Sequence, residues 1–440
     1  MDQSLWDMTK YRDLLHSAKL NTLEGKISRV TGMMIEAVGL ECSIGDVCEI
    51  HLSDGGTALA EVVGIADRVT YLMPYSEVDG IGYGCPVTTR GEKLTIKVSD
   101  ELTGRTINAL GIPIDDGPPI TGGVPVSING SPGNPLDRPP ISEIMEIGVK
   151  AIDALLTIGK GQRIGIFAGS GVGKSTLMGM IARNVRADIN VIALVGERGR
   201  EVVEFIERDL GPEGKKRSVL VVATSDQPAL MRLKCAQTAT AIAEYHQRRG
   251  KDVLLMMDSL TRFAMAKRET GLSIGEPPVA RGYTPSLYAV LPKLLERTGK
   301  FERGSITGIY TVLVEGDDVN EPISDTVRGI LDGHIVLSRS YAMRNHYPAV
   351  DILASVSRLM TEIVPQEHLQ MASEIRATLS TYYENYDLIS IGAYKMGTNP
   401  KIDYAIQNID RINEFLKQGI DEKFTFEETV ALMRGLVASK

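Results

Sequence analysis

Short, nearly continuous apolar runs recur through the middle of the chain, between about residues 144 and 345. The runs are Ile164–Phe167, Val191–Val195, Ser218–Val222, Asp252–Met257 and Ile309–Val314. Helix-compatible segments separate them. Strands that are buried on both faces have such continuous runs, and alternation with helices is typical of a parallel sheet. The pattern therefore predicts an α/β core.

The pattern differs on either side of this core. Residues 22–92 hold short β-branched runs such as Gly25–Thr31 between Gly and Asp turns, which predicts a small β-barrel. Residues 111–140 are rich in Pro and Gly and are typical of a linker with turns. After about residue 365 the strands stop, and an Ile and Leu stripe over 402–416 predicts a small helical domain.

The first residues have helical spacing. Leu5, Met8, Tyr11, Leu15 and Ala18 follow one another at steps of 3, 3, 4 and 3, which is one face of a helix. Such an amphipathic helix either docks on its own domain or is bound by a partner. The pattern alone leaves both hypotheses open.

Composition narrows the class of protein. At 440 residues the chain is too long for one core, and 43% hydrophobic and 24% charged residues are ordinary for a globular protein. A net charge of −8 argues against a protein that binds nucleic acid over its whole surface. The four cysteines form no C-x-x-C pair, and no signal peptide or membrane span is evident. We expect a cytoplasmic protein that meets a membrane only peripherally, through partners.

A glycine-rich segment, IFAGSGVGKSTLM, follows the first apolar run. The phosphate-loop pattern is G-x-x-x-x-G-K-[ST] between a strand and a helix, and only Ala168 departs from it. Backbone N–H groups and the helix N-terminus would surround phosphate oxygens, Lys174 would reach the β- and γ-phosphates, and Ser175 would ligate Mg²⁺. The predicted nucleotide-binding residues are Ala168, Gly169, Ser170, Gly171, Val172, Gly173, Lys174, Ser175 and Thr176.

Two acidic residues follow later apolar runs. Asp258 closes the run that ends at Met257, 84 residues after Lys174, and we predict that it is the second Mg²⁺ ligand. Glu197 follows the run that ends at Val195. At the carboxyl edge of a parallel sheet it would orient the attacking water. It could equally belong to a solvated charge cluster that starts a helix, and the residue pattern leaves these alternatives open.

Several segments together carry a resemblance to a known family. They are "GERGREV", "MMDSLTRFAMAKRE", "EPPVARGYTPS" and "YPAVDILASVSRLM". From about residue 22 onward the chain resembles the flagellar protein-export ATPases, a type III secretion ATPase family related to the rotary ATP synthase catalytic beta subunit. The resemblance implies a RecA-like P-loop NTPase core. The implied domains are an amphipathic helix (1–21), a β-barrel (22–92), the RecA-like ATPase domain (93–365) and a C-terminal helical domain (366–440).

The same resemblance assigns roles to single residues. Lys174 and Glu197 would both be catalytic, since non-catalytic rotary subunits lack one of the two groups. Arg198 would help to hold the γ-phosphate, Tyr347 would stack on adenine, and Arg358 would be an arginine finger that completes a neighbouring subunit's site. Arg262 could pair with phosphates or with Glu197, or serve a structural ion pair, and is left unassigned.

The implied function is Mg²⁺-dependent ATP hydrolysis by a homohexamer that energises export of flagellar proteins. The implied partners are a stator-like regulator that binds the N-terminal helix and a central stalk at the pore, which the loop 271–285 faces. The export gate and chaperone–substrate complexes are further implied partners. Nucleic acid is not expected as a partner. The sister injectisome ATPase is the main alternative. A rotary ATP synthase subunit and a hexameric RNA translocase are weaker alternatives, the latter because residues 22–92 hold few aromatics and the chain is acidic.

Overall fold

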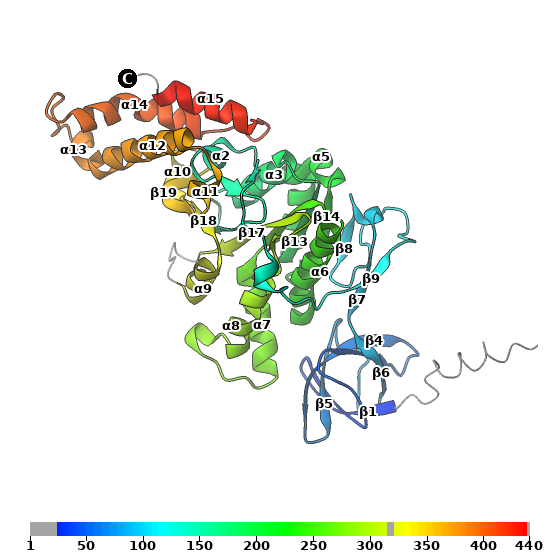
Figure 1. Cartoon of the computed structure of the whole chain (residues 1–440). Coiled ribbons are helices and arrows are strands. Elements are labelled where there is room, and N and C mark those ends of the chain that lie inside the picture. Colours follow the sequence, from blue (N-terminus) through cyan, green and yellow to red (C-terminus); the bar gives the residue numbers. More distant parts are fainter. Residues whose placement is uncertain (1–23, 315–320, 438–440) are drawn as a thin grey trace, which may run out of the picture. The chain divides into compact units, whose positions relative to one another are not determined.

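The computed structural model describes residues 24–314 and 321–437, so the expected N-terminal helix lies outside the described residues (Figure 1). Two compact units make up the chain. One comprises the residues up to Leu94 together with Ser273–Gly275, and the other comprises the remainder. Within the described ranges, no helix is both long enough and apolar enough to cross a lipid bilayer.

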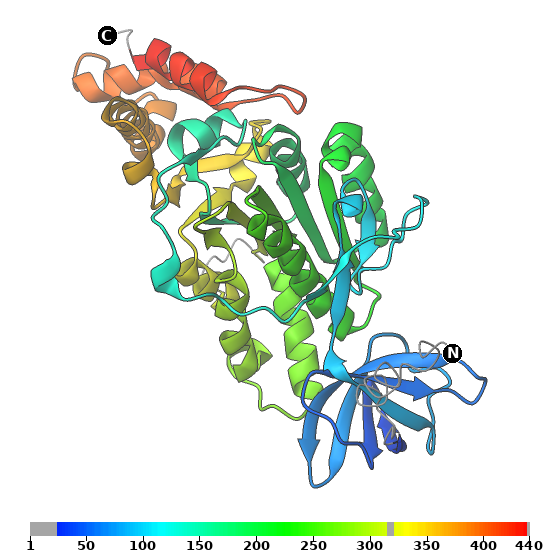
Figure 2. The same cartoon turned by 45° about the vertical axis from the view of Figure 1, so that its right-hand side comes forward.

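The first unit is a closed β-barrel, which confirms the prediction (Figure 2). Its strands follow the order β1-β2-β5-β4-β3-β6 around the barrel, and the paired strands are antiparallel. Apolar side chains such as Ile27, Ile50 and Leu72 fill the interior. The strands are β1 (Glu24–Thr31), β2 (Met34–Val38), β3 (Asp46–His51), β4 (Thr57–Ala66), β5 (Val69–Pro74) and β6 (Pro86–Lys93).

The second unit is built on a mostly parallel sheet, as the apolar runs predicted. Its strand order is β19-β18-β12-β17-β15-β13-β14-β8, with β16 paired to β17. Among the described strands of this sheet, only the β18–β19 and β16–β17 pairs are antiparallel. The strands are β8 (Thr106–Asn108), β12 (Arg163–Ala168), β13 (Ile189–Glu197), β14 (Ser218–Thr224), β15 (Asp252–Asp258), β16 (Gly299–Lys300), β17 (Ser305–Leu313), β18 (Gly333–Leu337) and β19 (Val350–Ser357).

Helices cover this sheet. On β13, Ile192 and Leu194 belong to the core shared with α2 and α3, and α6 also packs against β13. Every residue of β13 is buried, which explains its unbroken apolar run. The helices of this part are α2 (Lys150–Leu155), α3 (Lys174–Asn184), α4 (Gly199–Glu204), a π-helical turn η3 (Phe205–Leu210), α5 (Gly211–Lys216), α6 (Ala229–Arg248), α7 (Leu260–Ser273), α8 (Pro285–Leu295), α9 (Pro322–Ile330) and α10 (Arg339–Met343).

The expected linker at residues 111–140 contains more structure than predicted. Strand β9 (Val124–Ser127) lies within this range and pairs with β7 (Thr95–Val98). After this range, β10 (Ile144–Met145) and β11 (Ile158–Gly159) form a short two-stranded sheet. Pro125 lies within β9, where a two-stranded ladder tolerates the missing N–H at an edge. Single turns η1 (Asp100–Leu102), η2 (Pro135–Asp137) and η4 (Ala280–Gly282) complete the connections.

The C-terminal residues form the predicted helical domain, drawn orange to red in Figure 1. Asn399 caps the helix that begins at Pro400, and Thr425 with Glu428 forms the expected capping box before the last helix. α12 packs against α14 and α15, and α15 also packs against α2. The helices are α11 (Met360–Ile363), α12 (Gln366–Glu384), α13 (Tyr386–Ser390), α14 (Pro400–Leu416) and α15 (Phe426–Val437).

Candidate functional site

The glycine-rich segment forms a loop between the end of β12 and the start of α3. Gly173 has φ of 87°, a left-handed conformation that other residues rarely adopt, and directly precedes Lys174. A cavity of about 470 Å³ lies against this loop, and Gly169, Ser170, Gly171, Gly173, Lys174, Ser175 and Thr176 line it. The side chains of Ala168 and Val172 are instead buried in the core. The loop therefore presents backbone and polar groups to the cavity.

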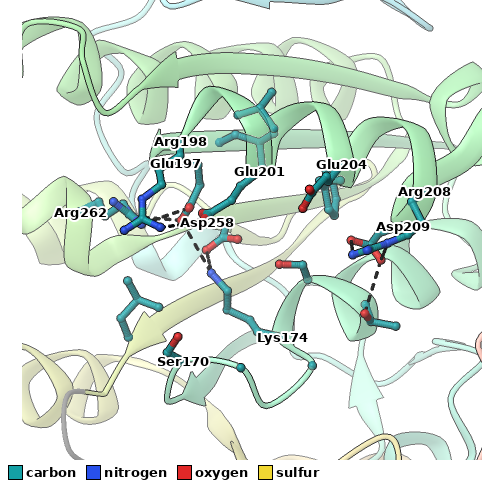
Figure 3. A pocket seen from close by; sticks show the side chains of 18 of the residues that line it. Ser170, Lys174, Glu197, Arg198, Glu201, Glu204, Arg208, Asp209, Asp258 and Arg262 are labelled. Atoms are coloured by element: carbon teal, nitrogen blue, oxygen red, sulfur yellow. Dashed lines mark hydrogen bonds and ion pairs between the residues drawn. The ribbon is translucent and has the colours of Figure 1, made fainter.

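Two carboxylates reach the same cavity from neighbouring strand ends. Glu197 is the last residue of β13 and Asp258 the last residue of β15, and these strands are paired. The Lys174 ammonium donates a hydrogen bond to Asp258 Oδ1 and lies 3.8 Å from Glu197 Oε1 (Figure 3). Thr311 on β17 donates to the same Asp258 oxygen at 2.6 Å. Lys174, Glu197 and Asp258 thus lie close together at the carboxyl edge of the sheet.

Arg262 pairs with Glu197, which is one of the alternatives that the sequence left open for this arginine. Its Nη2 donates to Glu197 Oε2 at 3.2 Å, and its Nε lies 3.0 Å from Oε1. Nevertheless, among the described residues neither Arg262 Nε nor Glu197 Oε1 has a hydrogen-bond partner, although both atoms are buried. The contact is an ion pair with poor alignment, so both groups keep hydrogen-bonding capacity for a ligand or water.

The electrostatic environment of Glu197 opposes its charged form. Burial, followed by the nearby charge of Asp258, raises the pKa of Glu197 to about 7, although Lys174 and Arg262 act in the opposite direction. A carboxyl group with such a pKa exchanges its proton near neutral pH. It therefore has the properties of a general base or a water-orienting group.

The rim of the cavity is charged. Arg198 is exposed, and its Nη1 lies 3.3 Å from Oε1 of Glu201, which belongs to α4. Asp209 on the π-helical turn lies within 3.4 Å of the Thr176 hydroxyl. Neither Glu201 nor Asp209 was predicted. Glu201 lies in the charged segment GERGREV that follows the strand and could have been found there, whereas nothing local marks Asp209.

Tyr347 lies next to the phosphate loop, outside the residues that line the cavity. A Cβ placed on Gly173 would lie 3.4 Å from Tyr347 Cε1, so the ring packs against the end of the loop. Tyr347 is 40% exposed, so a planar ligand can reach this residue.

Arg358 lies at the opposite end of the sheet from the loop. It follows β19, and its N–H donates to Asp332 O at 3.0 Å, while Asp332 also pairs with Arg163, the first residue of β12. The loop leaves β12 at Ala168, 168 − 163 = 5 residues later, which corresponds to about 17 Å of strand. Arg358 is exposed, and the fold keeps it away from the cavity of its own chain.

Comparison with known proteins gives matches along the chain. Family models match residues 27–91 (ATP synthase alpha/beta family, beta-barrel domain), 148–357 (the nucleotide-binding domain of the same family) and 364–435 (T3SS EscN ATPase C-terminal domain). The flagellum-specific ATP synthase of Bacillus subtilis is 58% identical, covering 94% of this chain and 95% of that protein. The type 3 secretion system ATPase of Xanthomonas euvesicatoria is 49% identical, covering 93% of each.

Solved structures match as well. The assembled ATPase EscN from the enteropathogenic E. coli type III secretion system has a TM-score of 0.88 at 47% identity, covering 94% of this chain and 100% of that chain. The same ATPase in complex with its central stalk EscO matches with a TM-score of 0.88 at 46% identity and the same coverage.

Proposed function

This chain belongs to the ATP synthase alpha/beta family, among the flagellum-specific and type III secretion ATPases, and we propose that it hydrolyses ATP to energise export of flagellar proteins. The observation that carries the proposal is the convergence of Lys174, Glu197 and Asp258 on one cavity beside a phosphate loop. A protein that only senses nucleotide needs Lys174 but has no need for Glu197, the second carboxylate near this lysine.

Lys174 and the loop N–H groups would bind the β- and γ-phosphates. The Ser175 hydroxyl and the Asp258 carboxylate line the same cavity and provide the oxygen ligands that Mg²⁺ prefers. The ion would supply charge neutralisation on the phosphate oxygens. Lys174→Ala should abolish ATP binding, because the loop loses its only cationic side chain.

Glu197 would orient the attacking water. Its Oε1 is a buried acceptor without a hydrogen-bond partner among the described residues, which suits a water molecule. Arg262 would fix the orientation of this carboxylate, and Arg198 at the rim would hold the γ-phosphate. A pKa close to neutral supports the proposed role of Glu197.

Arg358 would act on the nucleotide of a neighbouring copy. Its position at the far end of β12 supports action between chains, because its own phosphate loop leaves the strand at the other end. The matched EscN structures are assemblies. We therefore propose a homohexamer in which each site combines the Glu197 of one chain with the Arg358 of the next.

Mixing two inactive variants tests this proposal. Arg358→Ala keeps Glu197, and Glu197→Gln keeps Arg358; the finger is typically worth about 10³–10⁵ in turnover, so each variant alone should be nearly silent. In mixed hexamers, some interfaces combine the intact Glu197 with the intact Arg358, so activity should return in part. Co-assembled hexamers, verified by differential tags, that stay as inactive as either parent would contradict the proposal.

The flagellar assignment follows the higher identity to the flagellum-specific relative, while the injectisome remains the second candidate because type III secretion ATPases match nearly as well. The chain would work in the cytoplasm beside the inner membrane, with the export gate and chaperone–substrate complexes as partners. A central stalk would enter the pore beside the loop 271–285, and a stator-like regulator would bind residues 1–21. Restored filament assembly in a strain that lacks its flagellum-specific ATPase, and failure of the Glu197→Gln variant to restore it, would support this pathway; restored effector secretion alone would favour the injectisome.

A further inference from the structure

A buried glutamine ties the C-terminal helical domain to the nucleotide-binding core. Gln418 lies just after α14 and is 5% exposed. Its Oε1 accepts the Lys150 N–H at 2.8 Å, and its Nε2 donates to Gly148 O at 2.9 Å and to Glu422 O at 3.0 Å. All three contacts go to backbone groups, so one side chain fixes two chain segments against each other.

The last residue of the phosphate-loop helix joins the same cluster. Asn184 Nδ2 lies 3.3 Å from both Gly148 O and Glu422 O, the two carbonyls that Gln418 also binds. Gly148 has φ of 77°, and a Cβ there would lie 2.5 Å from Asn184 Cβ, so this approach requires glycine. α3 therefore starts at Lys174 in the phosphate loop and ends in the Gln418 cluster.

The backbone of Gln418 also holds the residue beside the phosphate loop. Its N–H donates to Tyr347 O at 3.0 Å, and the Tyr347 ring packs against Gly173. The side-chain hydrogen bonds of Gln418 thus fix the position of its backbone N–H. This N–H in turn holds the backbone of Tyr347, and with it the Tyr347 ring. A buried amide with three hydrogen bonds permits little displacement, because each lost bond leaves a buried group without a partner.

We propose that Gln418 is a positioning residue for nucleotide binding, and that it acts by holding the Tyr347 ring over the end of the phosphate loop. This inference rests on the proposed adenine-stacking role of Tyr347. Gln418 supplies no group to the phosphate end of the site, whose groups come from the loop, β13 and β15. It affects affinity for the base and leaves the chemical step alone.

The test compares ATP with a ligand that lacks the base. Gln418→Met keeps a long side chain and removes the three side-chain hydrogen bonds. It should raise the KM for ATP about three- to tenfold, as expected for loss of one or two net hydrogen bonds, with kcat within about twofold. The inhibition constant of inorganic tripolyphosphate, which has phosphates but no base, should not change. A raised inhibition constant for tripolyphosphate would instead show general distortion of the loop and overturn the inference.

Three further variants separate the possible failures. Gln247→Met is the matched control, because Gln247 is a buried amide near the C-terminal end of α6 whose Nε2 donates to Arg303 O at 2.7 Å. This variant should leave the KM for ATP unchanged. Tyr347→Ala should raise the KM, and the double variant with Gln418→Met should be no worse than Tyr347→Ala alone. If Tyr347→Ala raises the KM and Gln418→Met does not, the inference fails while the role of Tyr347 stands. If Tyr347→Ala leaves the KM unchanged, the proposed role of Tyr347 fails, and the inference fails with it.

Discussion

Two glutamate–arginine pairs of the α/β unit each contain a buried glutamate, and their hydrogen bonding differs. Glu244 on α6 accepts from Arg297 Nε at 2.7 Å and from Nη2 at 3.0 Å, and Arg297 Nη1 donates to Ile128 O at 2.9 Å. In the second pair, Arg262 gives Glu197 a single aligned hydrogen bond of 3.2 Å. Atoms of that pair remain buried without a partner among the described residues.

The difference separates a structural pair from a functional one. Each nitrogen of Arg297 donates a hydrogen bond, and neither Arg297 nor Glu244 has a buried side-chain atom without a partner among the described residues, so this pair serves packing and orientation. The Glu197–Arg262 pair borders a cavity with a lysine and a second carboxylate, and it retains unused donors and acceptors. Both glutamate side chains are 9% exposed, so burial of the carboxylate does not distinguish the two pairs, whereas completeness of hydrogen bonding does.

The largest expected effect is on catalysis. Glu197→Gln should lower kcat about 10²–10⁴-fold, because an amide does not accept a proton from water. The free energy of unfolding at pH 8 should not fall, because burial already disfavours the charged carboxylate there. Steady-state hydrolysis, ATP titration and thermal unfolding measure these effects, and ATP binding should persist. A Gln variant with nearly full turnover would place the base on another residue.

Breaking the structural pair should affect stability instead. Arg297→Met leaves the Glu244 carboxylate buried without its bidentate partner, and should lower the free energy of unfolding by about 3–5 kcal/mol. Adding Glu244→Leu should recover much of this loss, because an apolar pair needs no hydrogen bonds. Urea unfolding curves of the three proteins provide the measurement. A single variant as stable as the original chain would show that the pair does not stabilise the fold.

The pH dependence should sharpen the comparison. Because the pKa of Glu197 is about 7 and its deprotonated form is the active one, kcat/KM should fall as the pH decreases through about 7. Arg262→Met removes a positive charge that lowers this pKa, so the acid limb should move to higher pH. Profiles measured at constant ionic strength test the direction of the shift. An acid limb that moves to lower pH, or does not move, would show that the charge of Arg262 does not lower the pKa of Glu197.

The smallest effect is expected at the residue that holds Asp258. Thr311→Val removes the hydroxyl that donates to Asp258 Oδ1 and keeps the branched shape, so kcat/KM for MgATP should fall roughly three- to tenfold, as for one hydrogen bond. Thr307→Val on the same strand is the matched control, since its hydroxyl accepts the Gly161 N–H at the other end of the sheet. Equal losses in the two variants would assign the effect to β17 as a whole.

The sequence predicted the parts of the site that depend on local order. The phosphate loop, Glu197 and Asp258 each directly follow an apolar run, and parallel strands bring such positions to one edge. The partner of Arg262 depends on which strands are neighbours, and the single sequence does not contain the pairing of β13 with β15 that brings Arg262 to Glu197. The location of Arg358 likewise depends on β19 running antiparallel to β18.

Similar limits apply to the fold. The barrel, the parallel sheet and the helical domain follow from hydrophobic period and turn residues, which act over a few positions. The pairing of β9 with β7 was missed because its strand is only four residues long and contains proline. Gln418 carried no signal in the sequence, since its hydrogen-bond partners at Gly148 and Lys150 are about 270 residues away.

The position of Arg358 at the far end of β12 has a consequence for the cell's ATP supply. On the proposed arrangement, a newly synthesised chain has a phosphate loop but no finger facing it, so a solitary copy binds ATP and releases it unchanged. Turnover begins only where copies meet. The location at which rings assemble would then decide where in the cell ADP and phosphate are produced, and surplus unassembled chains would not drain the nucleotide pool.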